Sequence, residues 1–194
     1  MSTSLKALLK ELEAFGAAHD AAPANRASRM LNITHDTGEF LAVLVRAMGA
    51  RRVLEIGTSN GYSTLWLAEA AQAIGGVVTT VELSADKVAL ARANFARAGL
   101  RDRIVQVEGE AGDFLAASAD EAFDLVFLDS ARGAYLGWLA QIERVLRPGG
   151  LVVVDNATSH AQELAPFMQA LRSHGGWSTS LVPVGKGEFL AAKH

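Results

Sequence analysis

The stretch 53–64 constrains the fold of this chain more than any other. It begins with a short apolar segment that predicts a buried strand, continues through a polar turn bounded by Gly57 and Gly61, and becomes helical from Tyr62. A strand that leads through a tight glycine turn into a helix directs the backbone N–H groups of the turn at a ligand. The spacing Glu-x-Gly-x-x-x-Gly lacks the middle glycine of the Gly-x-Gly-x-x-Gly fingerprint, which argues against a dinucleotide pyrophosphate.

Glu55 adds a charge preference to this turn. From the carboxyl end of the strand, its carboxylate would repel a phosphate and attract a cation such as an amino group or a sulfonium. A strand, turn and helix of this kind also occur without any ligand, so the stretch alone leaves both interpretations open.

The motif Glu55-x-Gly57-x-x-x-Gly61-Tyr62-Ser63 resembles the first motif of class I S-adenosylmethionine-dependent methyltransferases. Its Gly-Tyr-Ser ending is similar to the catechol and caffeoyl-CoA O-methyltransferase branch of that family. The resemblance implies S-adenosylmethionine as the cofactor. It assigns these cofactor contacts to the turn and its flanks: Glu55, Gly57, Ser59, Gly61, Tyr62 and Ser63.

Strands and helices alternate along the rest of the chain. Strands are expected at 53–56, 77–81, 103–107, 123–128 and 151–154, with helices at 62–73, 84–98, 112–117, 135–146 and 161–173. A turn is expected at 148–150, and a final hairpin at 177–184 and 188–192. This order predicts an α/β fold with a doubly wound, mostly parallel sheet. The antiparallel hairpin at its end resembles the seven-stranded, Rossmann-like methyltransferase sheet.

The first 50 residues are expected to form a helical extension of one domain that spans 1–194. Helices are expected at 5–18, at 25–31 after a break at 21–24, and from 37 to 48 behind an Asp36 cap. The first of these has an apolar stripe, from which we expect a contribution to a homodimer.

Composition excludes several classes of protein. The length of 194 residues suits one domain, and the net charge of −3 does not favour a nucleic-acid backbone as the main partner. The absence of cysteine excludes disulfides and thiolate metal sites. No stretch approaches the roughly 18 apolar residues of a spanning helix, so we expect a cytoplasmic protein without a membrane anchor.

Further cofactor contacts are expected at the ends of the second and third strands. Glu82, followed by Leu83, could accept hydrogen bonds from both hydroxyls of a ribose, in a nicotinamide cofactor as well as in S-adenosylmethionine. The resemblance places Gly109, Glu110 and Ala111 beside the adenine. It also implies that the segment containing Asn32 and Ile33 closes over the cofactor.

Two neighbouring strand ends carry the strongest signal outside the first motif. Asp129 follows the fourth strand, and Asp155 and Asn156 follow the fifth. Two carboxylates and an amide oxygen are hard ligands suited to Mg²⁺ or Ca²⁺, and a divalent cation would relieve the repulsion between the carboxylates. The resemblance implies the same metal site and a cofactor contact for Asp129.

One position departs from the family pattern. The lysine that usually acts as general base, three residues after the strand-four aspartate, is replaced by Arg132. Arginine stays protonated in proteins, so Arg132 could stabilise a phenolate or a carboxylate but could not accept a proton. His35, His160 or water are the candidate bases, with the metal favouring ionisation of the hydroxyl.

These features predict an enzyme, an O-methyltransferase acting on a small, hydroxylated, catechol-like aromatic. The alternatives are a metal-independent methyltransferase, a nicotinamide-dependent oxidoreductase, a cofactor-binding protein without activity, and an RNA methyltransferase. The last would use a basic patch of Arg26, Arg29, Arg51 and Arg52.

Overall fold

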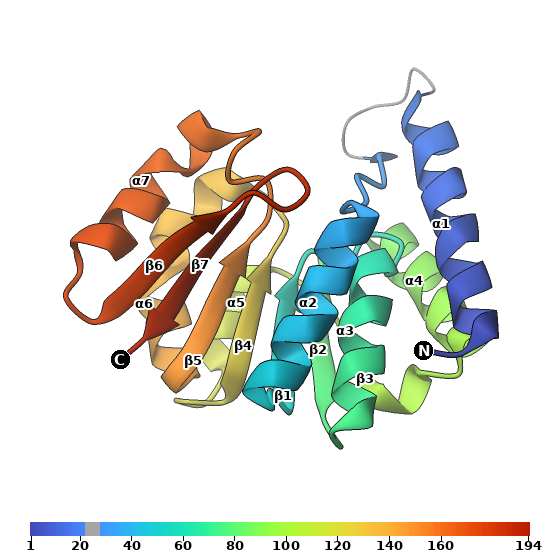
Figure 1. Cartoon of the computed structure of the whole chain (residues 1–194), viewed down its shortest axis with the longest axis horizontal. Coiled ribbons are helices and arrows are strands. Elements are labelled where there is room, and N and C mark those ends of the chain that lie inside the picture. Colours follow the sequence, from blue (N-terminus) through green and yellow to red (C-terminus); the bar gives the residue numbers. More distant parts are fainter. Residues whose placement is uncertain (22–27) are drawn as a thin grey trace.

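One seven-stranded sheet, in the order β3-β2-β1-β4-β5-β7-β6, forms the centre of the protein (Figure 1). The computed structural model describes residues 1–21 and 28–194. The strands are β1 (Arg52–Ile56), β2 (Val77–Glu82), β3 (Ile104–Glu108), β4 (Phe123–Leu128), β5 (Leu146–Val154), β6 (Trp177–Val182) and β7 (Glu188–Lys193). The first five pair in parallel, and β7 runs antiparallel to both β5 and β6. The predicted fold class is therefore confirmed.

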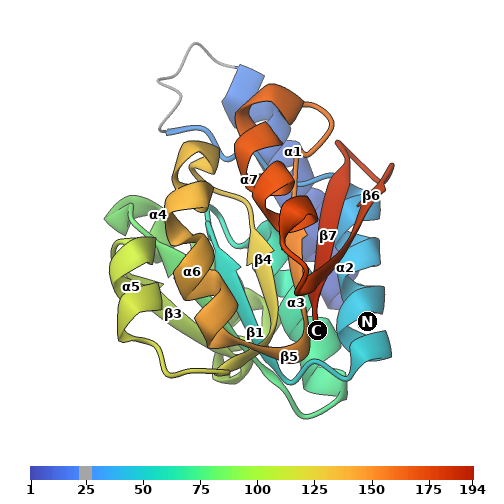
Figure 2. The same ribbon diagram turned by 90° about the vertical axis from the view of Figure 1, so that its left-hand side faces the viewer.

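Helices cover both faces of the sheet, as Figure 2 shows for α5 and α6 on one side and α2 on the other. The helices are α1 (Thr3–Ala21), α2 (His35–Met48), α3 (Tyr62–Ala73), α4 (Ala85–Ala98), α5 (Ala111–Ala117), α6 (Tyr135–Val145) and α7 (Ala161–Ser173). Alternate residues of each strand face opposite cores. In β1, Val53 packs with α1–α4, whereas Leu54 and Ile56 pack with α5–α7.

The predicted cap residue was confirmed for α4 but not for α2. Ser84 caps α4 by accepting a hydrogen bond from the Lys87 N–H, and Gly99 ends it in the left-handed conformation, as predicted. Asp36, in contrast, is not the cap of α2. The cap position is Thr34, and Asp36 lies in the first turn, where its carboxylate accepts hydrogen bonds from the Thr34 hydroxyl and from the Gly185 N–H.

Two other expectations about elements were wrong. Residues 29–31 of the expected helix 25–31 are not helical, and Leu31 has a φ of 51°. The remaining residues 25–27 of that helix, and residues 22–24 of the expected break, lie outside the described part. The expected turn 148–150 lies inside β5. Phe123 pairs with Leu146 and Leu125 with Leu151, so the extra residues form an irregularity within one strand.

The apolar stripe of α1 is buried within its own chain. Leu5, Leu8, Leu9 and Leu12 belong to the core shared with α2 and α3. They are therefore unavailable for the subunit contact that the sequence suggested. Within the described residues, no helix combines the length and the apolar character needed to cross a membrane.

Candidate active site

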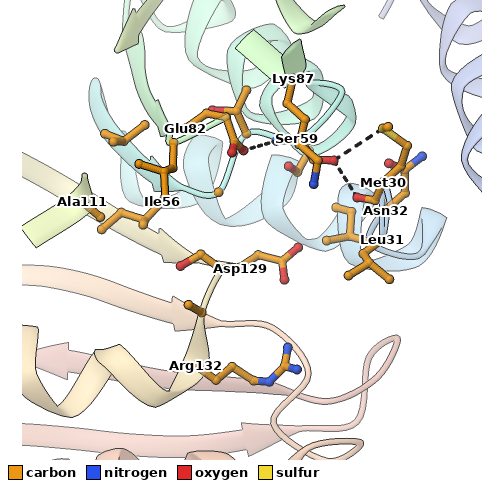
Figure 3. A pocket seen from close by; sticks show the side chains of 18 of the residues that line it. Met30, Leu31, Asn32, Ile56, Ser59, Glu82, Lys87, Ala111, Asp129 and Arg132 are labelled. Atoms are coloured by element: carbon orange, nitrogen blue, oxygen red, sulfur yellow. Dashed lines mark hydrogen bonds between the residues drawn. The ribbon is translucent and has the colours of Figure 1, made fainter. Parts of the chain in front are cut away.

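A cavity of about 630 Å³ opens at the carboxyl ends of β1, β2 and β4 (Figure 3). Ligands of open α/β sheets bind at this edge, because the loops there diverge to opposite faces of the sheet. Most of the residues that the sequence assigned to a site line this cavity. They are Asn32, Ile33, Gly57, Ser59, Tyr62, Ser63, Glu82, Leu83, Gly109, Glu110, Ala111, Asp129, Arg132, Asn156 and His160. Glu55, Gly61, His35 and Asp155 are not among its lining residues.

The glycine turn after β1 is shaped by close backbone approach. Gly57 has a φ of 105°, and a Cβ atom there would lie 2.1 Å from the carbonyl oxygen of Asp129. Gly61 is the cap position of α3 with a φ of 86°, and a Cβ atom there would lie 2.4 Å from the Phe95 ring. Both positions therefore require glycine, Gly57 so that β1 and β4 can end together at the cavity, and Gly61 so that α3 can pack on α4.

Glu55 does not present its carboxyl to the cavity. It is fully buried under α3 and accepts hydrogen bonds from the hydroxyls of Ser63, Thr64 and Thr80. Burial raises the pKa of this carboxyl to about 7, against the opposing effect of the three hydroxyl donors. In this geometry the Glu55 carboxyl does not reach a cation bound in the cavity. Instead, its hydrogen bonds link β1 to β2 and α3.

The buried Glu55 gives a prediction about stability. A carboxyl whose pKa rises from 4.5 to about 7 on folding binds its proton more tightly in the folded state. Its contribution to the stability of the folded state is complete below the ordinary pKa of 4.5. The contribution is lost as the pH rises through the pKa of the folded state. At about 1.4 kcal/mol per pH unit, the loss is about 3 kcal/mol. We therefore expect the free energy of unfolding of the wild type, measured in urea, to fall by this amount between about pH 4.5 and pH 7, relative to that of Glu55→Gln. Equal pH slopes for the two proteins would contradict it.

Glu82 lies at the rim of the cavity and is held by two backbone donors. The Ser59 N–H donates to its Oε2 atom at 2.9 Å (Figure 3), and the Ser84 N–H donates to its Oε1 atom at 3.0 Å. Each carboxylate oxygen keeps acceptor capacity for a further donor. The predicted geometry for a ribose contact is therefore present: an acidic side chain fixed in the cavity wall at the end of β2.

The segment before α2 forms another wall of the cavity. The Ser59 hydroxyl donates to the Met30 carbonyl oxygen at 2.6 Å, and the Lys87 ammonium donates to the Arg29 carbonyl oxygen at 2.8 Å (Figure 3 shows the side chains of Met30, Ser59 and Lys87). These contacts hold residues 29–33 against the glycine turn. The sequence signalled Asn32 and Ile33 but not the lysine that fastens the segment.

Several buried polar atoms around this cavity have no hydrogen-bond partner among residues 1–21 and 28–194. They include Nδ2 of Asn60, Oδ1 of Asn32, Oγ of Ser130 and Nε of Arg29, all from residues that line it. A buried polar group without a partner costs free energy comparable to a lost hydrogen bond. A polar ligand in the cavity would supply partners to these atoms, which supports a binding role. Asn60 was not selected from the sequence.

Asp129, Asp155 and Asn156 converge as the sequence predicted. The Asn156 amide nitrogen donates to Asp155 Oδ2 at 2.6 Å and to Asp129 Oδ1 at 3.2 Å. Asn156 adopts a φ of 67°, which turns its side chain back towards the two carboxylates. Burial, together with the negative charges of Asp155 and Glu55, raises the pKa of Asp129 well above its usual range.

Glu188 is a buried acid next to this group that sequence reasoning missed. The register of β5 and β7 pairs Val154 with Phe189, which brings Glu188, at the start of β7, opposite Asp155. Its Oε1 atom accepts a hydrogen bond from Thr37 at 3.0 Å, whereas within the described chain Oε2 has no partner of good geometry. Burial and the charge of Asp155 raise the pKa of Glu188 well above its usual range. The available signal was an acid opening an otherwise apolar strand.

The chemistry of the converging group fits a hard divalent cation. Both aspartates present an oxygen to one point, now taken by the Asn156 amide nitrogen, and rotation of that amide would present its oxygen instead. Burial first, and then the repulsion from Asp155 and Glu55, raise the pKa of Asp129, and a cation would relieve the repulsion. Among the described residues, no three His, Cys, Asp or Glu side chains are arranged as a metal site. A cation here would therefore rely on the amide oxygen and on water beside the two carboxylates.

The candidate bases differ in position. His160 lines the cavity, and its Nδ1 atom lies 2.9 Å from the Ser159 hydroxyl. His35 lies on α2, with its Nδ1 atom 2.8 Å from Glu13 and its ring against Trp66. His35 does not line the cavity, because its side chain points to α1, so the geometry does not support it as a catalytic base. Arg132 lies in the cavity wall, and its Nε donates to Glu163 at 2.7 Å.

Comparisons with known proteins agree on one family. The sequence matches the family model described as O-methyltransferase over residues 1–193. It is 42% identical over 140 residues to a protein named catechol O-methyltransferase from Mycobacterium tuberculosis. That match covers 72% of this chain and 61% of the relative, less than two thirds of the relative's length.

Solved structures agree with that match. Cofactor-bound Rv0187 from MTB has a TM-score of 0.81 at 32% identity, covering 100% of this chain and 90% of that one. The O-methyltransferase from Bacillus cereus in complex with SAH also has a TM-score of 0.81, at 27% identity, covering 97% and 91%.

Proposed function

The chain belongs to the O-methyltransferase family, and on that premise we propose that it transfers a methyl group from S-adenosylmethionine to a hydroxyl oxygen of a small, catechol-like aromatic. We propose that a divalent metal ion, Mg²⁺, assists at Asp129, Asp155 and Asn156. One observation carries the proposal. A single cavity is lined by Glu82 and the glycine turn and also by Asp129 and Asn156.

The cofactor end of the cavity supports binding of an adenosine. Glu82 is fixed by two backbone N–H groups and retains acceptor capacity for ribose hydroxyls. Gly109 and Ala111 line the wall beyond it, where an adenine ring would lie. The structure in complex with SAH, a product of methyl transfer, is of the B. cereus relative and supports the same ligand class here.

S-adenosylmethionine supplies an electrophilic methyl group, so the remaining task of the protein is to position the acceptor oxygen and favour its anionic form. A divalent cation held by the two aspartates and Asn156 would favour ionisation of a bound hydroxyl. Two adjacent hydroxyls suit such a site, which agrees with the name of the mycobacterial relative. His160 is the protein base that the cavity offers, and Arg132 would stabilise negative charge without accepting a proton.

The alternatives receive less support. Family membership argues against a nicotinamide-dependent oxidoreductase. For an RNA methyltransferase, Arg29 lies in the cavity wall, whereas Arg51 and Arg52 lie at the amino end of β1, where Arg52 pairs with Asp124; Arg26 is outside the described residues. The described arginines thus do not form the single patch that this alternative required. A metal-independent enzyme and an inactive cofactor-binding protein are distinguished by experiment.

The experiment that tests the proposal is a methylation assay with a panel of catechols, run with Mg²⁺ and with excess chelator. We expect product with Mg²⁺ and little with chelator. Product in both conditions would indicate a metal-independent methyltransferase. Binding of S-adenosylmethionine without any product would indicate a protein that has lost catalysis or that acts on another acceptor.

We also propose that the protein forms a homodimer, through surfaces other than the leucine stripe of α1. The leucine stripe of α1 is buried within the chain, so a dimer would have to use other surfaces. Phe15 on α1 and Val43 on α2 are exposed apolar side chains that such a contact could cover.

A further inference from the structure

Lys186 lies in the turn between β6 and β7 and lines the cavity together with Asp129, Asn156 and His160. We propose that its ammonium group binds an anionic substituent of the methyl acceptor, so that the preferred acceptors are hydroxylated aromatic acids. This inference rests on the proposed function and narrows its substrate class. The sequence pattern had not singled out Lys186, because nothing local relates the last hairpin to the ends of β4 and β5.

The backbone around Lys186 is fixed by contacts on both sides. Its carbonyl oxygen accepts hydrogen bonds from the N–H groups of Thr158 and Ser159, both at 3.1 Å, and the Gly187 carbonyl accepts one from Ala157 at 2.7 Å. A Cβ atom at Gly187 would lie 2.0 Å from the Thr158 hydroxyl oxygen, so the turn fits tightly on the loop after β5. Lys186 therefore extends from an anchored point beside the acceptor end of the cavity.

Two other cationic side chains of the cavity, Arg132 and Lys87, already have partners, and Arg29 belongs to the segment before α2 rather than to the loops after β4 and β5. Arg132 donates to Glu163 at 2.7 Å and is mostly buried, and Lys87 donates to the Arg29 carbonyl oxygen at 2.8 Å. Within the described parts of the chain, the ammonium of Lys186 makes no hydrogen bond or ion pair, although its charge lowers the pKa of Asp129. Lys186 thus has the capacity to take a ligand group beside Asp129 and Asn156.

The charge balance of the site indicates what that group is. A divalent cation would neutralise Asp129 and Asp155, and Glu163 neutralises Arg132. Of the described residues that line the cavity at Asp129 and Asn156, none then supplies a counter-charge to Lys186. A carboxylate on the acceptor would complete the balance through a charge-assisted hydrogen bond while the hydroxyls of the same ring lie at Asp129 and Asn156.

The test compares two acceptors that differ in one charge, protocatechuate and its neutral carboxamide. We expect the wild type to have a KM for the acid roughly 3- to 10-fold lower than for the amide, the range for a partly exposed charged contact. Lys186→Met keeps the length of the side chain and removes the charge, so it should abolish this preference, and Lys186→Glu should reverse it. Lys6→Met, an exposed lysine on α1, is the matched control and should behave as the wild type.

Binding of S-adenosylmethionine by calorimetry should be the same in all these proteins, which shows that the variants are folded and loaded. Equal KM values for acid and amide in the wild type, or a preference retained in Lys186→Met, would overturn the inference. So would an equal loss with both acceptors, because Lys186 would then act through Asp129 rather than on the substituent. If neither compound nor any other catechol is methylated by the wild type, it is the proposed function that fails.

Discussion

Asp155→Ala is expected to abolish methyl transfer while leaving the affinity for S-adenosylmethionine largely unchanged. Asp155 is buried, does not line the cavity and follows β5, whereas Glu82 ends β2, so its loss removes no cofactor contact at Glu82. It supplies one of the two carboxylates that would hold the cation, and it holds the Asn156 amide at 2.6 Å. Losing both effects should lower kcat/KM by at least about 100-fold.

The measurement pairs activity with metal binding. Calorimetric titration of the protein with Mg²⁺ should give a weaker or undetectable signal for Asp155→Ala and for the isosteric Asp155→Asn. Asp102→Asn, an exposed acid in the turn before β3, is the matched control and should bind and react as the wild type. Full activity of Asp155→Ala, or of the wild type in excess chelator, would show that this site is not a catalytic metal site.

Glu82→Ala is expected to weaken binding of S-adenosylmethionine by about 10- to 150-fold. The physical reason is the loss of hydrogen bonds from ribose hydroxyls to a charged acceptor, which contribute about 1.5–3 kcal/mol. Removal of the carboxylate also releases the Ser59 and Ser84 N–H groups, so part of the loss would come from a looser glycine turn. Calorimetry with the cofactor alone measures the effect without any acceptor.

A second pair of variants separates the two contributions. Glu82→Gln keeps an acceptor for one of the N–H groups and should bind with intermediate affinity. Glu108→Ala removes an exposed acid at the adjacent strand end, paired with Glu82 in the β2–β3 register, and should have no effect. An unchanged affinity in Glu82→Ala would refute the assignment of Glu82 to the ribose.

The order of elements and the position of the site could be predicted from the sequence because they depend on local patterns. Alternating strands and helices fixed a doubly wound sheet, and the glycine turn with acids at strand ends located the functional edge. Asp129 and Asn156 were correctly brought together, since neighbouring parallel strands end at the same edge. The strand that contains 148–150 was misread, because proline and glycine there signal a turn whether or not pairing resumes on both sides.

Side-chain direction was less accessible to sequence reasoning. Glu55 was expected to contact a cation, but the two-residue period of β1 points its side chain beneath α3. There it accepts hydrogen bonds from the hydroxyls of Ser63 and Thr64. His35 was a candidate base because Arg132 cannot accept a proton, yet the rotation of α2 directs it to Glu13. These are questions of which face a residue occupies, and neighbours in sequence do not settle them.

By itself, then, the sequence determined the fold class, the glycine turn and the pair of strand-end acids, because each follows from periodicity or turn chemistry within a few residues. The tertiary structure alone decided that Glu188 lies against Asp155 and that Lys186 lies in the cavity wall. Both residues come from the last hairpin, and their position depends on the antiparallel register of β7 against β5. That register is a long-range packing outcome, set when Phe189 and Ala191 enter the core beside Val152 and Val154.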